Sequence, residues 1–214
     1  LGGLDGHPDI SIPGIEANTG SLGMGISKAK GFLWAKKYLK KKGSVIVLTG
    51  DGEFQEGQIF EALQTVAHQK LNDLIVIMDH NKIQSSQYVK KIVDLLDLKR
   101  KIKSFGWHVE RCDGHNFKKI DMTFKKISRI KNKPKFIIAD TVKGKGVNFM
   151  EHTKVMKSNK YYNWHAGAPS ENNFQKAQSI LLKKIELFQK KIKFKNLKIT
   201  EITSKEIDNN IEIH

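Results

Sequence analysis

The sequence has one cysteine, Cys112, among its 214 residues, which excludes an internal disulfide framework and a zinc site made of several cysteines. It also lacks any apolar run near the roughly 20 residues that a bilayer-spanning helix needs. Nothing at its start looks like a secretory signal, and it opens with Leu-Gly-Gly rather than Met. We therefore expect a cytoplasmic protein without membrane contact, and a gene product that begins upstream.

Arginine is nearly absent, although the formal net charge is +16. Only Arg100, Arg111 and Arg129 accompany the many lysines, and aromatic residues make up 8% of the chain. Nucleic-acid sites favour arginine for paired contacts to bases and phosphates, and aromatic side chains for stacking. The surplus therefore fits lysine-rich codon usage better than a nucleic-acid partner, and we expect none. A positive field still suits phosphorylated substrates.

Short apolar runs alternate with helical patterns over the first two thirds of the chain. Continuous runs such as Val45–Leu48 are typical of strands buried on both faces. The predicted strands are 45–48, 74–78, 107–112 and 136–140, and the predicted helices begin at 20 and cover 55–69, 93–104 and 116–130. This order predicts an α/β fold: a three-layer, mostly parallel sheet with helices on both faces.

The remainder of the chain has a different character. After Asp140 we expect a Gly/Lys loop (143–146), an irregular stretch to about 169 and a helix over 173–192. The residues from 199 onward turn net acidic. We therefore expect one domain over 1–170, followed by a C-terminal helix and acidic tail (171–214) of unknown role.

Polar residues follow two of the predicted strands. Gly50-Asp51-Gly52 comes after the first strand, and Asn81-Lys82-Ile83 follows the next one. One helix connects these strands, so we expect Asp51 and Asn81 side by side at the carboxyl end of the sheet. A carboxylate, an amide oxygen and the carbonyl of Ile83 suit Mg²⁺, and glycine turns let the backbone approach a phosphate. Each feature alone is typical of an ordinary turn; together they predict a metal–diphosphate site.

Several longer motifs resemble the transketolase family, whose thiamine-diphosphate motif is GDG followed about thirty residues later by Asn. The resemblance extends over residues 1–170. Its motifs, in the family's order, are GHPD (6–9), PGIEANTGSLGMGIS (13–27), GDGEFQEGQ (50–58), AHQKLNDLIVIMDHNKIQ (67–84), FGWHVERCDGHN (105–116), KGKG (143–146) and NWHAGAP (163–169).

The resemblance implies a role for individual positions around thiamine diphosphate. Asp51, Asn81 and the backbone oxygen of Ile83 would hold Mg²⁺ or Ca²⁺ on the cofactor diphosphate. Gly50 and Gly52 would let the backbone contact that diphosphate. Gly20 and Leu22 would receive the aminopyrimidine, so that the bent cofactor can form its ylide.

The same resemblance implies three residues with acid–base or interface roles. His7 would lie beside the ketose hydroxyls, and His165 would lie near the diphosphate and the reacting carbon. Glu56 resembles the carboxylate that links paired cofactor sites across a dimer. The KGKG loop would help to neutralise phosphate at the mouth of the site. The other histidines at 80, 108, 115 and 152 are expected to be structural.

The implied activity is transfer of a two-carbon ketol unit between sugar phosphates, as in the pentose phosphate pathway. Nothing in the chain resembles the family's pyrimidine-binding module, which carries the glutamate that activates the ring. We therefore expect the N-terminal half of a split transketolase, which self-associates and needs a separate C-terminal subunit. Three alternatives stay open: half of a 1-deoxyxylulose-5-phosphate synthase-like enzyme, half of a 2-oxo-acid dehydrogenase-like enzyme, or a degenerate non-catalytic subunit.

Overall fold

The computed structural model describes residues 6–192, in which two units are distinguished. One unit comprises residues 6–20 and 168–192, and the other comprises 21–167. The domain boundary expected at residue 170 stays a prediction. The acidic segment from 199 lies outside the described residues.

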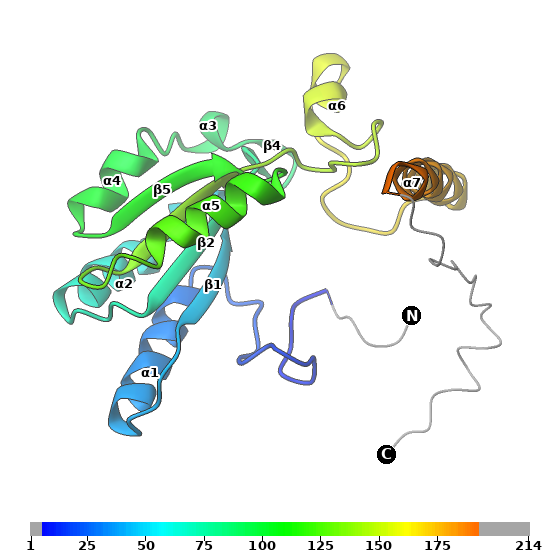
Figure 1. The fold of residues 1–214 in the computed structure, drawn as a ribbon. Coiled ribbons are helices and arrows are strands. Elements are labelled where there is room, and N and C mark those ends of the chain that lie inside the picture. Colours follow the sequence, from blue (N-terminus) through cyan, green and yellow to red (C-terminus); the bar gives the residue numbers. More distant parts are fainter. Residues whose placement is uncertain (1–5, 193–214) are drawn as a thin grey trace. The chain divides into compact units, whose positions relative to one another are not determined.

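The larger unit is built on a four-stranded parallel sheet (Figure 1). The strand order is β1-β2-β6-β5, and the strands are β1 (Val45–Gly50), β2 (Leu74–His80), β6 (Lys135–Asp140) and β5 (His108–Asp113). The register places Gly50 beside Asp79, and His80 beside Asp140. Because the strands are parallel and end at matching positions, their carboxyl ends form one continuous edge.

Helices cover both faces of this sheet, which confirms the predicted fold class (Figure 1). On one face, α1 (Gly25–Tyr38), α2 (Gly57–His68) and α4 (Leu98–Ser104) contribute to a single apolar core with alternate residues of the strands. Trp107 lies in this core, and its indole N–H donates to the carbonyl of Leu63 at 2.9 Å. On the opposite face, Lys126 of α5 (Phe117–Ile127) donates to Glu110 of β5.

The prediction that Val45–Leu48 is buried on both faces is wrong. β1 is an edge strand, and only Val45 and Val47 pack against the core. Ile46 and Leu48 point to the other face, where they are 57% and 74% exposed. An apolar run without alternation does not reveal which strand lies at the edge. The central strand β6 fits the pattern, because Lys135 to Ile138 are all buried.

The prediction of a single helix over 93–104 is also wrong. Residues 93–97, which lie between α3 (Val89–Ile92) and α4, are not helical. Leu96 adopts a φ of 55°, in the left-handed region that does not continue a helix. Asp97 then caps α4 by accepting a hydrogen bond from the backbone N–H of Arg100 at 3.0 Å. The apolar periodicity of this segment hid a turn and a new helix start.

Other element boundaries differ more modestly from the expectation. The first helix begins at Gly25 rather than at 20, because Gly20 and Gly23 have φ values of 106° and 82°. The helix expected over 55–69 is divided into a 3-10 turn η1 (Gly52–Gln55) and α2, with an extended Glu56 between them. The sequence did not indicate the hairpin β3 (Ile83–Gln84) and β4 (Gln87–Tyr88), or α6 (His152–Ser158).

The smaller unit contains the long helix α7 (Glu171–Ile192), near the predicted bounds. None of its residues is buried, and Leu181, Ile185 and Phe188 of its apolar stripe are 42%, 38% and 61% exposed. Within residues 6–192, no helix has both the length and the apolar character that crossing a bilayer requires.

Candidate functional site

The loops that follow β1 and β2 meet at the carboxyl end of the sheet. Asp51 Oδ2 accepts a hydrogen bond from the backbone N–H of Lys82 at 2.5 Å, and Oδ1 accepts one from Gly52 at 2.8 Å. Lys82 lies between Asn81 and Ile83, so the Asp51 carboxylate contacts the segment that carries both. The structure thus brings together the three residues that the sequence predicts as metal ligands.

Asn81 is held in a fixed orientation by two neighbours. Its amide nitrogen donates to Asp79 Oδ2 at 3.0 Å, and its amide oxygen accepts from the backbone N–H of Ile83 at 3.0 Å. The hydroxyl of Thr141 donates to the other oxygen of Asp79. Sequence reasoning missed Asp79 and Thr141. The signal that could have found Asp79 is its position two residues before Asn81, where it has the reach to fix the amide.

The site combines the buried acid Asp51 and the partly buried acid Asp79 with a nearby ammonium. Asp51 is 1% exposed, and burial raises its pKa, an effect to which the Asp79 charge adds and which N–H groups of Lys82 and Gly52 oppose. Burial lowers the pKa of Lys143, whereas the carboxylates of Asp79 and Asp51 act in the opposite direction. Lys143 therefore lies close enough to both acids for their negative charges to affect its pKa. A buried carboxylate is stabilised when a cation binds it.

Gly52 provides a close approach to the backbone of the GDG turn. A Cβ at this position would lie 2.9 Å from Cγ of Gln84, so a larger residue would displace that side chain. The amide oxygen of Gln84 is buried and has no hydrogen-bond partner among the described residues. An acceptor left free beside this turn suits a polar ligand, and Gln84 is a second residue that the sequence did not indicate.

Glu53 ties the GDG turn to the glycine loop before α1. Its Oε2 accepts from the backbone N–H of Gly50 at 3.2 Å, and its Oε1 accepts from Gly23 at 2.9 Å. A Cβ at Gly23 would lie only 2.8 Å from Cβ of Glu56, which is the exposed N-cap residue of α2. The predicted cofactor residue Leu22 precedes this contact and is 59% exposed. Leu22 and Glu56 therefore flank one packed glycine turn.

The KGKG loop and the NWHAGAP segment meet at a lysine–histidine contact. Lys143 Nζ donates to Nδ1 of His165 at 2.9 Å. Desolvation, and then the Lys143 charge, lower the pKa of His165, so the neutral imidazole is favoured. The buried His152 accepts from the backbone N–H of Lys143 at 3.1 Å and thereby fixes the loop.

The smaller unit brings two further predicted residues together. A Cβ at Gly20 would lie 3.4 Å from Cγ of His7, so the imidazole ring lies against the glycine. The backbone N–H and the hydroxyl of Thr19 both donate to the carbonyl of Pro8, at 3.0 and 2.9 Å. These bonds hold the segment of His7 beside that of Gly20.

The donor set fits a hard divalent cation rather than a transition metal. Within the described part of the chain, no group of three or more His, Cys, Asp or Glu side chains is placed to hold a metal ion. A carboxylate, an amide oxygen and a backbone carbonyl instead suit Mg²⁺ or Ca²⁺, whose remaining positions substrate phosphates and water can fill. The buried Asp51 and the unpartnered Gln84 oxygen both favour such a group.

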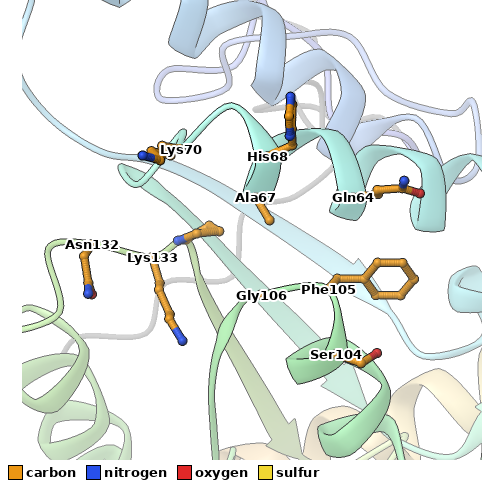
Figure 2. A pocket seen from close by; sticks show the side chains of 10 residues that line it. Gln64, Ala67, His68, Lys70, Ser104, Phe105, Gly106, Asn132 and Lys133 are labelled. Carbon is orange, nitrogen blue, oxygen red and sulfur yellow. The ribbon is translucent and has the colours of Figure 1, made fainter.

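A separate hollow of about 670 Å³ lies at the opposite, amino end of the strands (Figure 2). His68 and Lys70 border it where α2 ends, and Lys133 and Pro134 border it where β6 begins. None of the predicted site residues lines it. The hollow therefore belongs to a different part of the molecule from the site described above.

These observations define a class of protein: a three-layer α/β domain with an oxygen-rich site at the carboxyl ends of adjacent parallel strands. The chain belongs to the family described as the thiamine diphosphate binding domain of transketolase, which matches residues 3–161. The fold and the family agree with the resemblance seen in the sequence.

Two relatives and one solved structure illustrate the relationship. The chain is 36% identical over 187 residues to one of the subunits of apulose-4-phosphate transketolase from Phocaeicola vulgatus, a match covering 87% of this chain and 64% of that protein. It is 40% identical to the 6-deoxy-6-sulfo-D-fructose transketolase subunit of a Clostridium species, over 69% of this chain and 54% of that protein. The chain therefore spans between a little over half and somewhat less than two thirds of the length of these relatives.

The solved transketolase of Campylobacter jejuni shares the fold. Its TM-score is 0.64 at 24% identity, over 88% of this chain and 33% of that chain. The fold is thus that of the corresponding part of a much longer enzyme.

Proposed function

We propose that this chain is the diphosphate-binding half of a transketolase, which transfers a two-carbon ketol unit from a ketose phosphate to an aldose phosphate. The observation that carries this proposal is the hydrogen bond from Lys82 N–H to Asp51, which joins the GDG turn to the Asn81 loop in a member of this family. The alternative thiamine-dependent activities and the non-catalytic role have no comparable support.

Asp51, Asn81 and the carbonyl of Ile83 would hold Mg²⁺ or Ca²⁺, and the backbone at Gly50 and Gly52 would contact the diphosphate. Lys143 adds positive charge beside these acids and would neutralise phosphate. Gly20 and Leu22 would receive the pyrimidine ring. When bound, thiamine diphosphate supplies the carbon that carries the two-carbon unit.

His165 would act as a hydrogen-bond donor toward the diphosphate or substrate. Since an ammonium group has only donors, Nδ1 of His165 must accept the bond from Lys143. The neutral ring then carries its proton on Nε2, which faces away from Lys143. His7 would bind the ketose hydroxyls.

The partner would be a separate C-terminal subunit that supplies the pyrimidine module. Two relatives are named as subunits, which supports a divided enzyme. We further propose that the chain self-associates through Glu56. It would be located in the cytoplasm and use pentose phosphates. Because the two relatives are named for apulose 4-phosphate and 6-deoxy-6-sulfo-D-fructose, these sugars are also to be tested.

The test is a turnover assay of the chain with and without the separately encoded C-terminal subunit. Xylulose 5-phosphate and ribose 5-phosphate are supplied with thiamine diphosphate and Mg²⁺, and apulose 4-phosphate and 6-deoxy-6-sulfofructose serve as further donors. We expect turnover only when both subunits and both cofactors are present. Full activity of the chain alone, or no activity of the complex on any donor, contradicts the proposal.

A further inference from the structure

Asp140, the last residue of β6, joins the ends of three strands. Arg111 of β5 binds its carboxylate with two hydrogen bonds, Nε to Oδ2 at 2.6 Å and Nη2 to Oδ1 at 2.7 Å. His80, at the end of β2, lies with Nδ1 2.9 Å from Oδ1. Lys82 Nζ lies 3.6 Å from the same oxygen. One carboxylate thus contacts the residues on either side of Asn81.

The sheet register explains this arrangement. His80 and Asp140 are direct neighbours across β2 and β6, and Arg111 pairs with Ile138, two residues before Asp140. Side chains two residues apart on a strand share a face, so Arg111 approaches Asp140 diagonally on the same face as His80. Paired bonds to a guanidinium also fix the carboxylate plane, which a single ammonium contact does not.

The segment that Asp140 contacts is conformationally unusual. Lys82 has a φ of 69°, in the left-handed region that side chains other than glycine rarely adopt. Its backbone N–H is held by Asp51, and its ammonium lies near Asp140. A non-glycine residue keeps such a backbone only when its surroundings hold it there.

The carboxylate stays charged at any working pH. The Arg111 hydrogen bond, reinforced by His80 and the nearby charges of Arg111 and Lys82, holds the pKa of Asp140 far below its usual value against the effect of burial. The ionised carboxylate is therefore the form that contacts Arg111, His80 and Lys82.

We propose that Asp140, held by Arg111, is a positioning residue that fixes the 80–83 segment in the shape that presents Asn81 and Ile83 to the metal. This role rests on the proposed function, because it concerns the same metal site. In this role Asp140 and Arg111 act through His80 and Lys82, which Asp140 contacts directly. The residues come from three strands separated by about 30 residues each, which is why no sequence motif indicates them.

The experiment measures metal binding by the complete two-subunit complex with thiamine diphosphate present. Asp140→Asn keeps the size of the side chain and removes its charge, and Arg111→Gln removes the paired donor. We expect each variant to weaken Mg²⁺ binding by about 10- to 100-fold, as is typical when the partner of a metal ligand is lost. Ca²⁺ tolerates irregular geometry better than Mg²⁺, so its affinity should fall less and the Mg²⁺/Ca²⁺ preference should shift.

Glu110→Gln is the matched control. Glu110 also accepts from a histidine and a lysine, His108 and Lys126, but on the other face of β5 and away from residues 80–83. This variant should lose some stability while keeping the Mg²⁺/Ca²⁺ ratio of the wild type, because a general loss of stability does not alter the choice of metal.

The outcomes separate the two proposals. If the wild-type complex binds no thiamine diphosphate with either metal, the proposed function fails and this inference fails with it. If the wild type binds and both variants retain its metal ratio, only the positioning role is overturned. Should Asp140→Asn fail to fold, as judged by circular dichroism, the result for Arg111→Gln decides alone.

Discussion

Asp51 serves both the local backbone and the proposed metal. Its carboxylate accepts backbone hydrogen bonds from Gly52 and from Lys82, 31 residues away in sequence, and so closes the site. Burial at the same time raises its pKa, which marks an acid whose charge is costly without a cation. A side chain needed only for the turn would tolerate replacement by a neutral acceptor.

Replacing Asp51 by Asn should therefore affect the cofactor far more than the fold. We expect the Mg²⁺-dependent affinity for thiamine diphosphate to fall by more than roughly 100-fold, since loss of a ligand exceeds the loss of its partners. The free energy of unfolding without metal should change by about 1 kcal/mol, because the amide oxygen keeps only one of the two backbone bonds while the substitution also removes the cost of a buried charge. Calorimetric titration with Mg²⁺ and with a chelator measures the first, and urea denaturation measures the second.

Asp121→Asn provides the control for that substitution. This acid lies on the surface of α5, with its side chain 56% exposed and paired, among residues 6–192, with Lys125. Its cofactor affinity should equal that of the wild type. Equal affinity in the Asp51 variant would remove Asp51 from the metal site.

At the residue scale, the site residues that follow consecutive strands could be predicted from their order in the sequence. The contacts that depend on how the strands align with one another could not. Asp51 and Asn81 follow strands connected by one helix, so their proximity was predictable, and the structure shows it. Thr141 and Gln84 have no signature of their own, because their contacts depend on side-chain direction at the strand ends. The chemical roles of all these residues stay predictions.

At the scale of elements, a polar contact attaches α5 to β5. Glu110 accepts from Lys126 at 2.9 Å and lies 2.8 Å from Nε2 of His108. Burial alone would raise the pKa of Glu110, but the hydrogen bonds and charges of Lys126 and His108 lower it below 4.5. The folded state thus favours the ionised carboxylate.

The Glu110→Gln variant should reveal this contact as a pH-dependent difference in stability. An acid whose pKa is lowered by folding stabilises the protein fully above its unfolded pKa, here 4.5, and loses that contribution as the pH falls through the folded value. We expect the variant to be less stable by about 0.5–1 kcal/mol near pH 7, discounted because Lys126 is largely exposed. Urea denaturation of both proteins at a series of pH values should show the difference shrinking below about pH 4.5. A difference that does not change with pH would assign the loss to packing.

Most elements were predictable from apolar runs and periodicity, and the errors have identifiable physical causes. The parallel order and the helices on both faces follow from strand–helix alternation. The break at Leu96 and the extended Glu56 depend on single backbone conformations that leave periodicity intact. Whether a strand lies at an edge depends on its partners, which is why β6 matched the expectation and β1 did not.

At the scale of the whole molecule, the open face of β1 affects solution behaviour. Ile46 and Leu48 are 57% and 74% exposed on one face of an edge strand. Exposed apolar side chains beside unpaired strand hydrogen-bonding groups promote association between chains. Ile46→Thr together with Leu48→Lys should keep strand propensity on this strand while making the face polar.

We expect this double variant of the isolated chain to show a slower rise in light scattering on concentration or mild heating, with an unchanged circular dichroism spectrum. The control is Ile92→Thr with Leu96→Lys, which replaces two residues that are 46% and 75% exposed outside the four-stranded sheet. If both variants behave alike, general hydrophobicity rather than the strand edge governs association.

The two loops that carry Asp51 and Asn81 belong to a single strand–helix–strand unit, β1-α2-β2, and β1 and β2 are direct neighbours. Contacts so near in sequence form at low entropic cost, without waiting for distant parts of the chain. In a divided enzyme, this strand–helix–strand unit alone would bind the diphosphate end of the cofactor. The pyrimidine ring would be bound only after the two subunits associate. A change in the second polypeptide could then alter how the ring is bound without disturbing the metal–diphosphate site of the first.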